Sequence, residues 1–296
     1  MSVFEGRVVV GYDGSAGSGE AVDWAAAEAS RRGLPLMVLC AYDVSSLVGA
    51  SPGLPTAGWE EAARLAADGA DRARKLSHGI EVTAEDATGT AASLLIDASA
   101  NAELVVVGTR GLGPVAGVLL GSVAFAVAAH AACPAVIVHG EQVAAGPDHP
   151  VVIGVDDSVR CQAALRFAAA VAADVDAPLT VLCVSRPAAA DAWAAAYWSA
   201  AAPEVNPEAA ALNAAQQVAD AAVALVRQEF PTVRVDGKAV AGSPTDLLAL
   251  ESRNAGLLVV GARGRGGFSG LHLGSVSRGL IHEAFCPVAV VPAGRS

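Results

Sequence analysis

The sequence predicts an α/β protein built from two tandem copies of a Rossmann-like domain, each a doubly wound, five-stranded parallel sheet. Two observations carry this prediction. Short β-branched, apolar runs alternate with segments of helical periodicity, and the whole pattern occurs twice along the 296 residues. Strands that alternate with helices pair in parallel through right-handed crossovers, so helices cover both faces of the sheet.

In the first half, strands are expected where apolar residues are nearly continuous, as is typical of strands buried on both faces. These runs are RVVVGY (7–12), LMVLCAY (36–42), LVVVGT (104–109) and PAVIVH (134–139). The segment IEVTAED (80–86) alternates instead, which predicts a strand nearer an edge. Helical spacing ended by Gly or Asn predicts helices at 19–33, 59–77 and 90–101, and a short helix follows Gly121 and Ser122.

The duplication is visible residue by residue. VVVGYDGS at 8–15 matches VVIGVDDS at 151–158, and the same offset still pairs Cys40 with Cys183. From Gly89, which matches Gly242, the offset is longer and again constant. One constant offset at the start of the repeat and a second, ten residues longer, in its remainder indicate a duplicated domain with an insertion in the second copy.

The domain boundaries follow from this match. The first domain is placed at 1–140 and the second at 151–296, with a linker at 141–150 that Gly and Pro punctuate. The insertion lies between Cys183 and Gly242, in a run rich in alanine and aromatic residues. Its aromatic residues are Trp193, Tyr197 and Trp198, which are expected either to pack over the second site or the domain interface, or to form a partner-binding patch.

A glycine pattern follows the fourth expected strand of both halves. It has the form G-x2-G-x9-G-S, and glycine allows a close backbone approach to a ligand. Free N–H groups at the start of the next helix form an anion site, to which the serine hydroxyl and a loop arginine can contribute. The residues of the first copy are Gly108, Arg110, Gly111, Gly121 and Ser122, and those of the second are Gly261, Arg263, Gly264, Gly274 and Ser275. The pattern predicts a polyphosphate site, and the alternative is that these glycines only shape the turn.

A carboxylate follows the first strand of each half, Asp13 in one and Asp156 in the other. The first and fourth strands are neighbours in a doubly wound sheet, so each carboxylate is expected beside the glycine loop. There it can accept a hydrogen bond from a ribose hydroxyl or hold a metal near phosphates. The alternative is a helix N-cap, shared with Ser15 and Ser158.

Together these residues resemble the universal stress protein family, in its ATP-binding, tandem two-domain form. The resemblance rests on the glycine loop, the Asp after strand one and the closing strand that begins Cys-Pro, and it covers nearly the whole chain. It implies an adenine nucleotide alpha hydrolase-like fold with one ATP site per domain. The implied site residues of the first domain are Gly11, Asp13, Ser15, Ala41, Gly108, Arg110, Gly111, Gly121, Ser122 and Val123. Those of the second are Gly154, Asp156, Ser158, Val184, Gly261, Arg263, Gly264, Gly274, Ser275 and Val276.

Roles within the site are also implied by the resemblance. The two aspartates would meet the ribose, the backbone at Ala41 and Val184 the adenine, and the glycine loops and serines the phosphates. Mg²⁺ would bind mainly through the phosphates, with Asp13 and Asp156 as candidate ligands. In the second copy Asp157 replaces Gly14, and its negative charge is expected to weaken that site relative to the first.

The resemblance further implies a nucleotide-responsive regulator of a stress or dormancy response rather than an enzyme, read by a regulatory protein partner. The closing strands, 135–139 and 288–292, would pair across a pseudo-twofold axis, so the chain forms its own pseudo-dimer, and a homodimer stays open. An ATP-hydrolysing or adenylyl-transferring enzyme of the same superfamily also stays open, although no general base is evident beyond the two aspartates. A purely structural role for the loops would leave the protein without nucleotide.

Other nucleotide folds fit less well. A P-loop needs GxxxxGK followed by Ser or Thr, but alanine follows Gly237 and Lys238. A dinucleotide fingerprint at 111–116 follows the fourth strand instead of the first. A flavodoxin-like loop at 14–20 is reasonable in the first half, but the second half has no glycine there.

The composition of the chain indicates which partners and which cell compartment to expect. The formal charge is -11, so nucleic acid is not an expected partner. Gly117–Val138 carries no formal charge, but Cys133-Pro134 interrupts it, so no membrane span is expected. Without a visible signal segment or CxxC spacing, we expect a cytoplasmic protein with five reduced, buried cysteines. The six histidines form no metal-binding motif.

Overall fold

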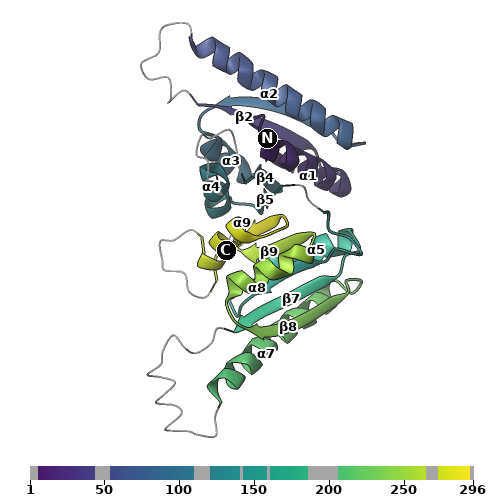
Figure 1. Cartoon of the computed structure of the whole chain (residues 1–296). Helices are drawn as coiled ribbons and strands as arrows, with labels where there is room; N and C mark the ends of the chain where they lie inside the picture. The colour runs from purple at the N-terminus through teal and green to yellow at the C-terminus, as the bar shows by residue number, and fades with distance from the viewer. Residues whose placement is uncertain are drawn as a thin grey trace. The chain divides into compact units, whose positions relative to one another are not determined.

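The computed structural model describes residues 6–43, 54–109, 121–140, 143–158, 161–185, 206–264 and 273–293 (Figure 1). The chain divides into two compact units. The first contains Met1–Gln142 together with Pro287–Pro292, and the second contains Val143–Cys286 together with Ala293–Ser296. The expected linker therefore contributes most of its residues to the second unit, where Ala145 packs so closely on Gly256 that a methyl group there would overlap it.

The first unit is built on a sheet with the strand order β3-β2-β1-β4-β5-β10. Its strands are β1 (Val8–Gly11), β2 (Leu36–Tyr42), β3 (Val82–Thr88), β4 (Leu104–Gly108), β5 (Ala135–Val138) and β10 (Val288–Val291). The strands from β3 to β5 pair in parallel, as the sequence predicts. The alternating strand β3 lies at the edge and is half-exposed, which confirms its predicted position.

The closing strands of the two repeats pair with each other. β10 runs antiparallel to β5, with Val288 opposite Ile137 and Val290 opposite Ala135. All residues of both strands are buried. This pairing was expected from the family resemblance, and it explains why the two strands are uniformly apolar: neither has a side that faces water.

Four helices cover the sheet of the first unit: α1 (Ala16–Arg32), α2 (Leu54–Leu76), α3 (Ala91–Ser99) and α4 (Ser122–His130). α1 packs beside α2, and α3 beside α4. α1 ends at Gly33, whose φ of 63° is a left-handed conformation that glycine adopts without strain. The core consists of strand residues such as Val9 and Val106, both fully buried, beneath alanines of α1.

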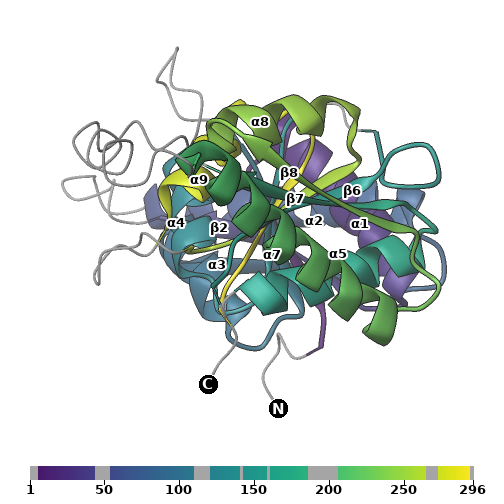
Figure 2. The ribbon, with the colours of Figure 1, turned by 90° about the horizontal axis from the view of Figure 1, so that it is seen from below.

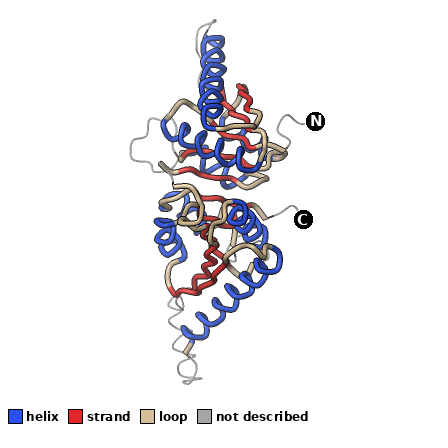
Figure 3. Tube along the Cα trace, turned by 90° about the vertical axis from the view of Figure 1, so that its right-hand side faces the viewer, coloured by secondary structure: helices blue, strands red, loops and turns tan. Residues whose placement is uncertain are grey.

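The second unit repeats this plan with the strand order β9-β6-β7-β8, all parallel. Its strands are β6 (Val151–Val155), β7 (Leu179–Ser185), β8 (Val235–Ala241) and β9 (Leu257–Gly261). Its helices are α5 (Cys161–Asp174), α7 (Pro207–Glu229), α8 (Pro244–Glu251) and α9 (Ser275–Glu283), with a 3-10 turn at Ser252–Asn254. Figure 2 shows α5 and α7 on one side of β7 and β8, with α8 and α9 on the other, and Figure 3 distinguishes helices from strands by colour in both units.

The two long helices α2 and α7 show where the ten extra residues of the second repeat lie. Each helix has 23 residues, and their first residues, Leu54 and Pro207, are already separated by the longer of the two repeat offsets. The extra residues therefore lie between Ser185 and Pro207, a narrower interval than the sequence match alone allows. Trp193, Tyr197 and Trp198 fall outside the described residues.

The described part of the uncharged stretch Gly117–Val138 does not form one helix. α4 ends at His130, and β5 begins at Ala135 after the Cys133-Pro134 break, as predicted. Separately, α7 is long and apolar enough to cross a bilayer by length and composition alone. In this structure its buried residues, among them Val223 and Val226, belong to the face that packs on β7 and β8.

All five cysteines are free and buried, which confirms the prediction of small core residues. Burial raises the pKa of the Cys133 and Cys286 thiols to about 12 and that of Cys40 and Cys161 to about 11. A thiol in this environment stays protonated at neutral pH and is a poor nucleophile.

These pKa shifts predict how stability depends on pH. The thiol pKa is raised in the folded state from about 9, so above pH 9 the unfolded chain releases protons that the folded chain retains. The free energy of unfolding should therefore decrease as the pH rises from 9 to about 12, measured by urea denaturation. Cys286→Ala should show a shallower decrease than the wild type, and an identical slope would contradict the assignment.

Candidate functional site

The carboxyl ends of β6, β7 and β9 open into a cavity of about 1020 Å³ in the second unit. This is the edge at which ligands bind in doubly wound sheets. The cavity brings together nine of the ten residues expected for this domain, and Ser158 is the one that does not line it. The nine are Gly154, Asp156, Val184, Gly261, Arg263, Gly264, Gly274, Ser275 and Val276.

The carboxylate of Asp156 is held where strand one meets the glycine loop. Its Oδ1 accepts hydrogen bonds from the backbone N–H of Ser158, at 3.1 Å, and from its hydroxyl, at 2.5 Å. The other oxygen lies against the backbone of Gly264, so closely that a methyl group at this position would overlap it. Ser158 therefore orients the carboxylate instead of lining the cavity, and Gly264 permits the approach because it has no Cβ.

Two hydrogen bonds join the start of α9 to the end of β9. The N–H of Gly274 donates to the carbonyl of Ala262 at 2.8 Å, and the Ser277 hydroxyl donates to the carbonyl of Gly261 at 2.7 Å. These bonds hold the start of α9 beside the end of β9, so the glycine loop begins and ends at the same place. The amide of Gly274 is thus used within the protein, and this glycine positions the helix.

The start of α9 presents donors to the cavity. Gly274 is the N-cap and has no side chain to satisfy the first turn, so the serine hydroxyl does not serve as the cap. The N–H groups of Ser275 and Val276 have no acceptor within the helix, and the helix dipole adds positive potential at this end. Arg263 lines the same cavity. The arrangement suits an anion such as a phosphate.

Small and mostly apolar residues, which the sequence motifs do not reveal, also line the cavity. They include Cys161, Leu182, Ser185, Ala211, Ala214, Ala215, Val218 and Leu248. The alanines come from α7, where they are indistinguishable by composition from alanines on a solvent face. The longer repeat offset, applied to the helix after the insertion, is the signal that could have found them.

The first unit shows the same local geometry around Asp13. Its Oδ1 accepts from the Ser15 N–H at 3.0 Å and from the Ser15 hydroxyl at 2.6 Å. Ser15 is the N-cap of α1, because its hydroxyl accepts a hydrogen bond from the N–H of Ser18. Asp13 therefore does not cap this helix. Gly14, with φ of 81°, makes the turn between them, whereas Asp157 in the second unit is not left-handed.

The rest of the first site is partly described. The N–H of Gly121 donates to the Thr109 carbonyl at 2.7 Å, which repeats the loop closure of the second unit. Gly121 caps α4, so Ser122 and Val123 begin that helix. Ala41 lies in β2 opposite Ala87, as expected for a residue near the strand's carboxyl end. Arg110 and Gly111 lie outside the described residues.

Several expected glycines also have a packing role. The Leu95 side chain packs over Gly11, and Leu248 packs so closely over Gly154 that a methyl group would overlap it. Gly108 ends β4 directly beneath the backbone carbonyl of Gly17 at the start of α1. These positions are glycine because helices must sit close to the sheet there, which is a structural reason in addition to any contact with a ligand.

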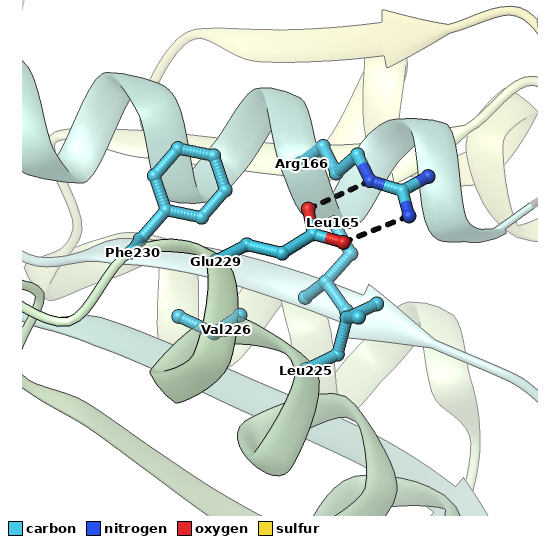
Figure 4. A pocket seen from close by; sticks show the side chains of 6 residues that line it. All are labelled: Leu165, Arg166, Leu225, Val226, Glu229 and Phe230. Atoms are coloured by element: carbon cyan, nitrogen blue, oxygen red, sulfur yellow. Dashed lines mark hydrogen bonds and ion pairs between the residues drawn. The ribbon is translucent and has the colours of Figure 1, made fainter.

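Among the described residues, no three His, Cys, Asp or Glu side chains come close enough to hold a metal ion. A second depression, between α5 and α7, has no measurable internal volume. Figure 4 shows that the Arg166 guanidinium and the Glu229 carboxylate pair across it, at 2.8 and 2.9 Å. This depression is a helix contact and offers no space to a ligand.

Comparison with known proteins agrees with the fold. The model of the universal stress protein family matches twice, at residues 6–139 and 149–292. A universal stress protein of Mycolicibacterium smegmatis is 33% identical, with 98% of each chain covered, and universal stress protein Rv2005c of Mycobacterium tuberculosis is 34% identical over 96% of each. The crystal structure of a universal stress protein from Archaeoglobus fulgidus shares the fold, with a TM-score of 0.72 and 22% identity over 98% of both chains. The chain belongs to the universal stress protein family, and it is a tandem, two-domain member.

The packing at Gly108 can be tested without any ligand. In Gly108→Ala the new methyl group would meet the Gly17 carbonyl, which is backbone and cannot rotate away. We expect the variant to lose about 1–3 kcal/mol of stability, typical of overpacking, in urea denaturation. Gly146→Ala is the control, because the space around that glycine is open. Equal stability of the two variants would show that β4 and α1 are not in close contact.

Proposed function

We propose that the protein binds ATP at the carboxyl edge of each sheet, one molecule per repeat. The observation that carries the proposal is the approach of Asp156 to Gly264 within a cavity that also contains the start of α9. A carboxylate, a row of backbone N–H groups and an apolar wall are the three chemical environments that a nucleoside triphosphate requires.

Each part of the nucleotide has a counterpart in the second unit. The Asp156 carboxylate would accept from the ribose hydroxyls, because Ser158 already fixes its orientation. The backbone at Val184 and the alanines of α7 would contact the adenine. The amides of Ser275 and Val276, with Arg263, would hold the phosphates, and Asp13, Ser122 and Val123 are the matching residues of the first unit.

Magnesium would be held mainly by the phosphates. The described residues provide no three-ligand cluster for it, and Mg²⁺ in nucleotide sites commonly keeps several water ligands and few protein carboxylates. Asp13 and Asp156 are the candidates for a protein ligand. Both already accept hydrogen bonds from a serine, which favours a role in orientation.

We further propose that the protein is a cytoplasmic, nucleotide-responsive regulator of a stress or dormancy response, which binds ATP without consuming it. Hydrolysis needs a base that activates water, and the two aspartates are bound to serines that hold them for the ribose. A regulatory protein partner would then sense whether the sites are filled. The alternative, slow ATP hydrolysis or adenylyl transfer, uses the same bound nucleotide.

Replacing either of two adjacent carboxylates in the second site should change the affinity for ATP, in opposite directions. Asp156→Asn removes the ribose acceptor and should weaken ATP binding by about tenfold or more, since hydrogen bonds to charged groups contribute about 1.5–3 kcal/mol. Asp157→Asn removes an exposed negative charge that lines the cavity and should strengthen binding slightly. Isothermal titration calorimetry with Mg-ATP checks both, and the proposed ribose contact is wrong if Asp156→Asn binds as the wild type does.

Binding and turnover are separated by a time course. Purified protein incubated with Mg-ATP should return the nucleotide intact over hours, followed by chromatography of ADP, AMP and pyrophosphate. Turnover that falls in Asp13→Ala or Asp156→Ala and disappears when both are replaced would favour the enzyme. Turnover that persists in the double variant would point to a contaminant.

A further inference from the structure

The two repeats can be compared position by position around the base side of each site. The strands β2 and β7 correspond at the shorter offset, and α2 and β3 correspond to α7 and β8 at the longer one. The pairs that carry the comparison are Tyr42 and Ser185, Gly58 and Ala211, Glu61 and Ala214, Leu65 and Val218, and Asp86 and Ala239. In each of these pairs except Gly58 and Ala211, the second repeat has the smaller residue, whereas Ala41 and Val184 differ in the opposite direction.

In the second unit, these positions leave space. Ser185, Ala211 and Ala214 all line the cavity of about 1020 Å³. Their side chains are short, so the described part of the wall formed by β7 and α7 leaves room beside the end of the strand. None of the described residues of β7 and α7 that line the cavity has a ring like that of Tyr42.

In the first unit, Tyr42 occupies the corresponding space. Its ring lies against the backbone of Gly58 on α2, so closely that a methyl group at Gly58 would overlap the ring. The Tyr42 hydroxyl is buried and has no hydrogen-bond partner among the described residues. The neighbouring Trp59 donates from its indole N–H to the carboxylate of Asp86 on β3, which holds this part of α2 over the ring.

The charges of the two sites also differ. Burial, with the negative charges of Asp13, Asp86 and Glu61, raises the pKa of Cys40 to about 11, so all three carboxylates act on the strand-two end of the first unit. The positions of Glu61 and Asp86 are alanines in the second unit. The Glu61 carboxylate is paired with the Arg64 guanidinium at 2.6 Å, so charge alone does not rank the two sites, and the ranking follows from the space around the base.

We infer that the two sites are unequal: the second repeat holds the tight nucleotide site, and Tyr42 fills the base side of the first, which binds nucleotide weakly. This inference rests on the proposed function. It reverses the ranking that Asp157 alone suggests, because the space that Tyr42 occupies beside the base outweighs one exposed carboxylate. Tyr42 in the first repeat and Ser185 in the second are thus the residues that set the occupancy of each site.

The test is the number of tight sites per chain, measured by equilibrium dialysis with Mg-ATP. The wild type should bind one ATP tightly, with a second affinity weaker by about tenfold or more. Tyr42→Ser should raise the tight stoichiometry toward two, a gain that loss of folding cannot produce. Ser185→Tyr should remove the tight site, with thermal denaturation to verify that it folds.

Two conservative variants serve as controls. Tyr42→Phe keeps the ring and should bind as the wild type does, and Ser185→Ala keeps the open wall and should retain the tight site. Two equal tight sites in the wild type, or an unchanged stoichiometry in Tyr42→Ser, would overturn the inference and leave the proposed function intact. Absence of ATP binding in every variant, Tyr42→Ser included, would overturn both.

Discussion

The close approach of the Asp156 carboxylate to the backbone of Gly264 is the contact on which the site depends. It joins the residue after β6 to the loop after β9, two strands that are neighbours in the sheet although the whole of α5, α7 and α8 separates them in the chain. Any side chain at position 264 would push the two apart. Glycine is therefore required at this position for steric reasons. Its small size lets a carboxylate lie beside the loop whose amide groups favour anions.

The hydrogen bonds around this contact recur in the described residues of both repeats. Gly121, which caps α4, donates from its N–H to the carbonyl of Thr109 after β4 at 2.7 Å. Gly274, which caps α9, donates in the same way to the carbonyl of Ala262 after β9 at 2.8 Å. The serine that follows each Asp fixes its carboxylate with two hydrogen bonds. These contacts use main-chain atoms and short side chains, so they tolerate sequence divergence in a duplicated domain. The base sides of the two sites are lined by side chains of α2 and α7, and there the copies have diverged.

Much of this architecture could be predicted from the sequence. The strands, the edge position of β3 and the break at Cys133-Pro134 follow from periodicity and composition. Asp156 and the glycine-loop residues of the second cavity follow from glycine spacing and the constant offsets, and Val184 was implied by the family resemblance. The alanine wall of α7 could not be recognised, because a helix alanine has the same appearance in sequence whether it faces a cavity or water. Nor could sequence decide between Asp13 and Ser15 as the cap of α1, since both residue types serve, and only the hydrogen bond from Ser18 distinguishes them.

A structure of the protein crystallised with excess Mg-ATP is the most direct test of the central claim. We expect triphosphate density at the N-terminus of α9, with the ribose on Asp156 and the base between the end of β7 and the alanines of α7. Nucleotide bound elsewhere, or an empty cavity in which Asp156 still lies on Gly264, would contradict it.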